Sequence, residues 1–161
     1  MKEKTLKLKK GGLDTIVAYI VVMLPLLYVL IYMVATIYHF SVQTYVSQVA
    51  KEAIVMASTY GQITPNHEQY IKDKLSSVVG NVKIGYRHKV FNDDSGLVTG
   101  GNTLQTTIPT VSKGDIVGIY VESSEDSILG KVTAFNIFGA NDTSSGLKYS
   151  AYREEIIRNE K

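Results

Sequence analysis

The sequence contains no cysteine. A disulfide framework, a thiolate zinc site and a cysteine nucleophile are therefore excluded, and the fold must rest on packing alone. This composition is compatible with an extracytoplasmic domain that does not rely on disulfides, and also with an intracellular domain.

Signatures of catalysis and of metal binding are also missing. The three histidines, His39, His67 and His88, lack the His-x-x-x-His or Glu-x-x-His spacing of a metal site, so we expect them to be surface or hydrogen-bonded side chains. Gly100-Gly101 lacks the neighbours of a phosphate-binding loop. We expect no catalytic residue, no metal and no cofactor, and an enzyme is the least favoured class.

Two short polar segments receive no functional assignment. Residues 122–126 are rich in acids but lack the Asp-x-Asp-x-Asp-Gly layout of a calcium loop, so we expect a solvated acidic loop. Lys113-Gly114-Asp115 resembles a short integrin-type tripeptide, but three such residues in a turn before a strand recur by chance.

Positive charge is concentrated in the first ten residues, which hold five lysines and one glutamate. Residues 41–161 hold twelve Lys/Arg against thirteen Asp/Glu. The basic excess is therefore an N-terminal feature, and we expect no nucleic-acid partner.

Residues 15–38 contain no charged side chain. As a helix they would be about 36 Å long, enough to cross a hydrocarbon core of about 30 Å. A chain of 161 residues has little room to bury so apolar a helix on every side, which favours a membrane span over a core helix. The run also exceeds the apolar core of a signal peptide, which has about 7 to 15 residues.

The flanking charges predict the direction of this span. Lysines precede it, and the chain after it has no Lys or Arg until Lys51. The positive-inside rule then places the N-terminus in the cytoplasm and residues 41–161 outside. The protein would cross the membrane once, and its span would contact membrane lipid.

Several residues in the span suggest more than a tether. Pro25 is tolerated in membrane helices and predicts a mild kink. We expect Tyr19, Tyr28 and Tyr32 to pack against another helix, because their hydroxyl groups need partners, whereas Tyr38 also suits the membrane interface.

An amphipathic pattern continues the helix beyond Phe40, and Gly61 offers a stop. Apolar residues recur at alternating spacings of four and three, as in a heptad seam. They are Val42, Val46, Val49, Ala53, Met56 and Tyr60. The seam either packs on its own domain or stacks against copies of the chain, and the two uses are not exclusive.

The rest of the chain predicts a small antiparallel sheet with short helices. Thr64 and Pro65 begin a helix over residues 65–79, which Gly80 ends. We expect strands at 82–91, 103–108, 116–121 and 147–157, with 116–121 central because it is the most apolar. Residues 128–139 favour a short helix or irregular structure, and 141–146 a loop. The fold class is α+β, a long N-terminal transmembrane and amphipathic helix packed with a small antiparallel sheet domain.

Three stretches carry a resemblance to a known family. They are Leu24-Pro25-Leu26-Leu27, Val49-Ala50-Lys51-Glu52-Ala53 and Ala57-Ser58-Thr59-Tyr60-Gly61. Together with the lysine-rich leader and Gly11-Gly12, they resemble the type IV pilin-like architecture, and more narrowly the TadE-like minor pilins of tight-adherence systems, over residues 9–61.

The resemblance implies a prepilin peptidase that cuts after Gly11 or Gly12, and an acidic residue that registers neighbouring subunits. In pilins that acid is a glutamate five residues after the cut, where this chain has Ile16 or Val17. Asp14 is the only acid nearby. The implied partners are related pilin-like subunits, the peptidase and an inner-membrane assembly platform.

The sequence thus predicts a leader at 1–12, a membrane helix at 13–40, its amphipathic extension at 41–61 and an extracytoplasmic domain at 62–161. We expect a pilin-like or pseudopilin-like structural subunit of a bacterial cell-surface filament, secretion or conjugation apparatus. The alternative is a stand-alone, membrane-anchored binding module such as an adhesin or sensor.

Overall fold

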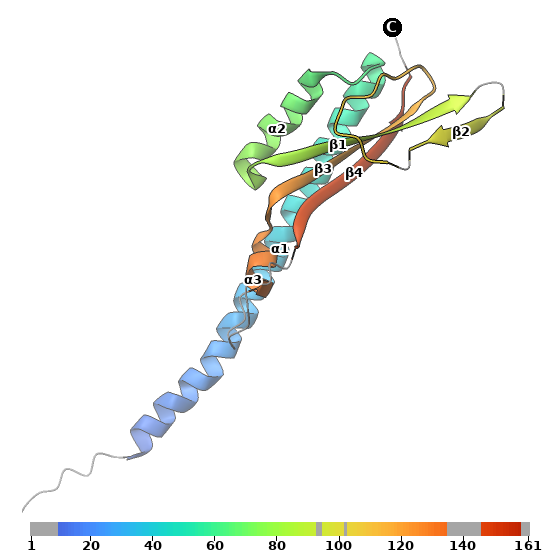
Figure 1. Cartoon of the computed structure of the whole chain (residues 1–161). Helices are drawn as coiled ribbons and strands as arrows, with labels where there is room; N and C mark the ends of the chain where they lie inside the picture. Colours follow the sequence, from blue (N-terminus) through green and yellow to red (C-terminus); the bar gives the residue numbers. More distant parts are fainter. Residues whose placement is uncertain (1–9, 93–94, 102, 135–145, 159–161) are drawn as a thin grey trace, which may run out of the picture.

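The computed structural model describes residues 10–92, 95–101, 103–134 and 146–158 (Figure 1). One helix, α1 (Lys10–Tyr60), runs through 51 residues, and Pro25 lies inside it. Its C-terminal part lies along the sheet beside α2 (Pro65–Val79), while its N-terminal part extends away from the domain. The predicted α+β fold, a long apolar helix packed on a small antiparallel sheet, is confirmed.

The sheet has four antiparallel strands in the order β2-β1-β3-β4. They are β1 (Val82–Asn92), β2 (Leu97–Gly100), β3 (Ile116–Asp126) and β4 (Lys148–Ile156). The apolar strand β3 lies between β1 and β4, so its predicted central position is confirmed. The last strand of the chain, β4, therefore forms one edge of the sheet.

The core forms where α1 crosses the sheet. Ala50, Ala53 and Ala57 on α1 are fully buried, as are Val117 and Ile119 on β3. Short alanine side chains let the helix backbone approach the sheet closely, while the β-branched residues of β3 fill the space between the two layers. The amphipathic part of α1 is therefore the inner wall of the domain.

Polar contacts fix β4 along α1. The side-chain amide of Gln43 both donates to the Ser150 carbonyl and accepts from the Ser150 N–H. Further along, the Ser58 hydroxyl donates to the Ile156 carbonyl at 2.5 Å. The unpaired edge of β4 is thus satisfied in part by side chains of α1.

Helix α2 begins and ends where the sequence predicts. Pro65 occupies its first turn, and the Thr64 N–H donates to Nδ1 of His67 at 3.0 Å. Burial lowers the pKa of His67, which keeps the ring neutral and its Nδ1 free to accept. Gly80 has a φ of 70° and ends the helix.

The prediction of a strand at 103–108 is wrong. On the outer side of β1 the paired strand is β2, and β2 ends at Gly100 because Gly100 and Gly101 have φ values of 88° and 83°. After this bend the chain returns to β1 at one point only, an isolated bridge between Gln105 and Tyr86.

The acidic loop predicted at 122–126 is also wrong, because these residues complete β3. Ser123 is buried, accepts the Tyr149 N–H at 3.1 Å and donates to the Glu125 carbonyl at 2.7 Å. Those bonds hold the strand through a register irregularity between Glu122 and Asp126.

The ambiguous segment 128–139 begins as a short helix, α3 (Ile128–Ala134). Residues 135–139, and all but Gly146 of the predicted loop at 141–146, lie outside the described residues.

Candidate functional site

The N-terminal half of α1 extends away from the sheet (Figure 1), and most of its apolar side chains are exposed. Among its exposed large apolar residues, the exposed fractions run from 41% for Tyr32 to 66% for Tyr19. A soluble domain rarely leaves an apolar surface of this extent uncovered, so the surface marks a contact with lipid or with another protein.

In the described chain, one helix is long and apolar enough to cross a membrane, and it is this one, within Thr15–Tyr60. By length and composition this helix agrees with the charge-free run at 15–38, which it contains.

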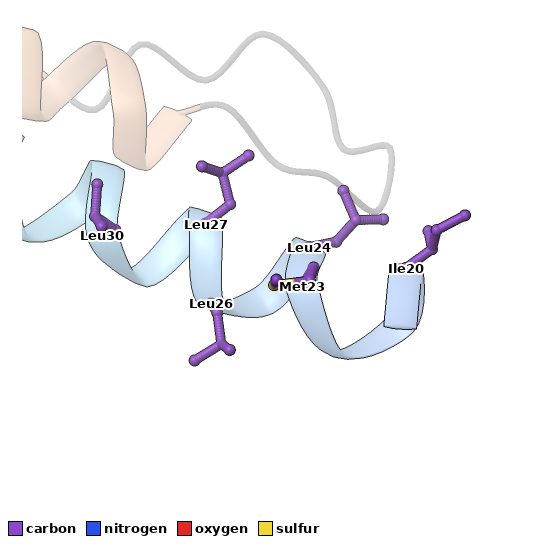
Figure 2. A pocket seen from close by; sticks show the side chains of 6 residues that line it. All are labelled: Ile20, Met23, Leu24, Leu26, Leu27 and Leu30. Carbon is purple, nitrogen blue, oxygen red and sulfur yellow. The ribbon is translucent and has the colours of Figure 1, made fainter. Parts of the chain in front are cut away.

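Leucines and other long apolar residues surround Pro25 on this surface. Figure 2 shows Leu24 and Leu27 on one side of the helix and Leu26 on the other. Together they line a shallow hollow with walls of almost pure hydrocarbon. The lining residues are Ile20, Met23, Leu24, Leu26, Leu27 and Leu30. Proline has no backbone N–H to donate to the preceding turn of the helix. The side chains around Pro25 are apolar, so this surface is suited to contact with hydrocarbon.

The four tyrosines of the span, three predicted for helix packing and Tyr38 for the membrane interface, divide into two groups. Tyr19, Tyr32 and Tyr38 are exposed at 66%, 41% and 42%. Tyr28 is half-buried, because it lies in a groove formed with α3 of the same chain. Only the exposed three remain available to another helix or to the membrane interface.

Most of the heptad-like seam packs on its own domain, whereas its last residue, Tyr60, is 69% exposed. Val42, Val46, Val49 and Ala53 are between 0% and 5% exposed and belong to the core cluster, and Met56 is half-buried. Side chains this deeply buried cannot also contact a second subunit. Intramolecular packing is therefore the use that the structure shows for these residues, and a contact between copies through α1 would fall to its exposed half. The assembly role of the seam stays a prediction.

The residues implied in processing and registration lie in the first two turns of α1. Gly12 is exposed, and a Cβ added there would meet nothing within 4 Å. Gly11 and Asp14 occupy the same helical segment. Their roles as cleavage site and registration residue stay predictions.

An unpredicted polar cluster centres on Asp115, which is 4% exposed. Nε2 of His88 lies 2.8 Å from its Oδ2, and the backbone N–H groups of Ser112 and Phe91 donate to the carboxylate at 2.8 and 3.3 Å. Burial works to raise the pKa of Asp115, but these hydrogen bonds outweigh it and hold the pKa below its usual range. The cluster ties the turn before β3 to β1, a structural role that the Lys113-Gly114-Asp115 tripeptide did not signal.

Replacing Asp115 with asparagine should lower the free energy of unfolding by about 1–3 kcal/mol at neutral pH, because charge-assisted hydrogen bonds are lost. The native carboxylate stabilises fully above the ordinary aspartate pKa of about 3.9, and this contribution disappears as pH falls through the lower folded-state pKa. Thermal unfolding of the full-length protein in detergent, measured from neutral to acid pH, should show the gap between wild type and variant closing on acidification. A gap that stays constant would contradict this role.

His39 departs from the expectation of a surface or hydrogen-bonded ring. It is 9% exposed and stacks on Tyr149 of β4 with ring centroids 5.0 Å apart. In the described part of the chain its Nδ1 has no hydrogen-bond partner. The stack marks the level at which α1 enters the domain.

Within the described ranges, no group of three His, Asp or Glu side chains lies close enough to hold a metal ion.

Comparison of the chain with protein-family models, with curated proteins and with solved structures gives no significant match. The class of the fold is therefore described from its architecture alone. A long N-terminal apolar helix, half exposed and half packed on a four-stranded antiparallel sheet, is a pilin-like architecture.

Proposed function

We propose that this protein is a membrane-anchored, pilin-like or pseudopilin-like structural subunit of a bacterial cell-surface filament, secretion or conjugation apparatus. The observation that carries the proposal is the division of α1. One half is buried in the domain, while the other is an uncovered apolar rod that continues the same 51-residue helix.

A continuous helix gives such a subunit two properties. The exposed half supports insertion into a membrane before assembly and contact with other apolar helices afterwards. The buried half fixes the domain rigidly to that rod, because the core is built on it. Copies that align their rods would thereby display their domains at a regular spacing.

In this proposal the lysine-rich leader stays in the cytoplasm and the sheet domain lies outside, as the charge distribution favours. A prepilin peptidase would cut after Gly11 or Gly12, and Asp14 would lie at the membrane edge near the amino end of a neighbouring subunit. An inner-membrane assembly platform and related pilin-like subunits are the proposed partners.

A specific surface supports the alternative, a stand-alone binding module. The hairpin of β1 and β2 carries exposed apolar residues at the far edge of the sheet, with Phe91 at 40%, Leu97 at 64% and Val98 at 47%. That patch could contact a ligand without any assembly through α1. The two functions therefore differ in whether the rods of separate copies touch.

Cysteine cross-linking tests this difference, because the native chain contains no thiol. In an assembled subunit the rods of neighbouring copies touch, so mild oxidation of cell membranes should convert a Leu26→Cys protein to a disulfide-linked dimer. A disulfide forms only between cysteines whose Cα atoms are closer than about 7 Å, so the dimer reports that contact. Thr59→Cys is the matched control, as it is exposed on the same helix but in the outer domain. A dimer yield from Leu26→Cys no higher than that of the control would favour the stand-alone module.

A further inference from the structure

A second element of the domain lies beside the apolar rod. Helix α3 follows β3 and lies against the N-terminal half of α1 (Figure 1). A groove runs between the two helices. The groove measures about 440 Å³. Its lining residues are Leu24, Leu27, Tyr28, Ile31, Ile128, Lys131 and Val132. This volume falls within the range of about 300–1,000 Å³ that ligand-sized pockets occupy.

The groove lies at the level of the charge-free run of α1. A hydrocarbon core of about 30 Å holds about twenty helical residues. Those twenty residues include the groove positions 24–31 whether they begin at Thr15 or end at Tyr38. A membrane that surrounds the rod therefore also reaches α3.

The chemistry of the groove suits hydrocarbon. Its walls are aliphatic apart from Tyr28 and Lys131. The Lys131 ammonium group points to Glu125, with Nζ and Oε2 3.4 Å apart, so its methylene stem forms the wall. Ile128 remains 45% exposed even though it lines the groove, which leaves part of its apolar surface uncovered.

Several polar groups at the start of α3 are bonded within the protein. Ser127 is fully buried, and its hydroxyl oxygen accepts the Gly130 N–H at 3.0 Å. The Ser127 N–H donates to the Leu147 carbonyl at 2.8 Å, which fixes the start of α3 to the segment before β4. The Thr133 hydroxyl donates to carbonyl groups of the preceding turn. Bonds of this kind lower the cost of placing the start of a helix in an apolar environment.

We propose that α3 is a second membrane contact of the domain, and that the groove between α1 and α3 holds an acyl chain of a lipid from the leaflet on the domain side. This inference rests on the membrane span of the proposed function. It adds that the domain touches the bilayer at a second place, so the orientation of the sheet relative to the membrane is fixed.

Tryptophan fluorescence tests the proposal, because the native chain contains no tryptophan. Ile128→Trp and Val132→Trp are reconstituted as full-length protein in vesicles of phosphatidylcholine and phosphatidylglycerol with brominated acyl chains. Both should lose fluorescence to nearly the same extent as Val22→Trp, a reporter in the middle of the exposed rod. Val55→Trp, which is exposed on α1 within the domain, should keep its fluorescence.

Each other outcome has a distinct meaning. Quenching of Val22→Trp without quenching of either α3 reporter would overturn the lipid contact and leave the span intact. An unquenched Val22→Trp would remove the span itself, and the inference with it. Quenching of the α3 reporters that disappears as the protein-to-lipid ratio rises would assign the groove to a second copy of the chain instead of an acyl chain. Circular dichroism and thermal unfolding show which of the two α3 reporters keeps the native fold.

Discussion

Replacing Val49 with aspartate is expected to unfold the outer domain. Val49 is 2% exposed and lies in the core between α1 and the sheet. An unpaired charge buried there costs about 3–5 kcal/mol, which is a large part of the roughly 5–15 kcal/mol that stabilises a typical domain. Limited proteolysis and near-ultraviolet circular dichroism of the detergent-solubilised protein should show loss of fixed packing, whereas the exposed half of α1 stays helical.

Val55→Asp is the matched control for this substitution. Val55 lies on the same helix and has the same side chain, but it is 43% exposed. Its replacement should change the free energy of unfolding by about 0.5 kcal/mol or less. A Val49→Asp protein as stable as Val55→Asp would mean that α1 does not pack on the sheet as described.

The second large effect is expected from two charges in the exposed rod. Leu26→Asp combined with Leu30→Asp places both near the middle of the charge-free run, where each costs about 2.5–3.5 kcal/mol on insertion. Both leucines are exposed at 58% and 59%, so neither contributes to the core of the domain. The variant should move from the membrane fraction to the soluble or aggregated fraction in cell fractionation, and it should form no assemblies.

The control is Leu26→Ala with Leu30→Ala, which shortens the same side chains without adding charge. It should remain in the membrane fraction. If the double aspartate variant also remained there, the rod would not be the membrane anchor, and the proposal of a pilin-like subunit would lose its basis.

These two experiments test the two halves of α1 independently, one for its role in the core and the other for its role in the membrane. The sequence pattern distinguished these two roles only in part. The run without charge and the heptad-like spacing were both evident from sequence, and so were the bounds of α2, where Thr64 and Gly80 supply the local signals. The spacing of Val42, Val46 and Val49 identified a buried stripe. It could not name what covers that stripe, because a sheet and a second helix impose the same helical period.

Other features depend on contacts that are distant in sequence. Strand β2 is four residues long and fully exposed, so it lacks the alternation that reveals a strand. The role of Asp115 arises from His88 and Phe91, more than twenty residues away. The acidic segment at 122–126 is part of a strand because it pairs with β1 and because the Ser123 hydroxyl accepts the Tyr149 N–H of β4. Sequence patterns report local periodicity, whereas these positions are decided by tertiary pairing.

The position of β4 against α1 has a consequence for biogenesis. The bonds of Gln43 to Ser150 and of Ser58 to Ile156 join residues 107 and 98 positions apart, so the two ends of the domain must meet before the core closes. Such non-local pairing slows folding, because the entropy of closing the long loop is lost before the contacts form. If the domain folds outside the membrane, nearly the whole polypeptide must be translocated first. Until then the inner face of the amphipathic half of α1 is uncovered, which is when this chain would most need protection from aggregation.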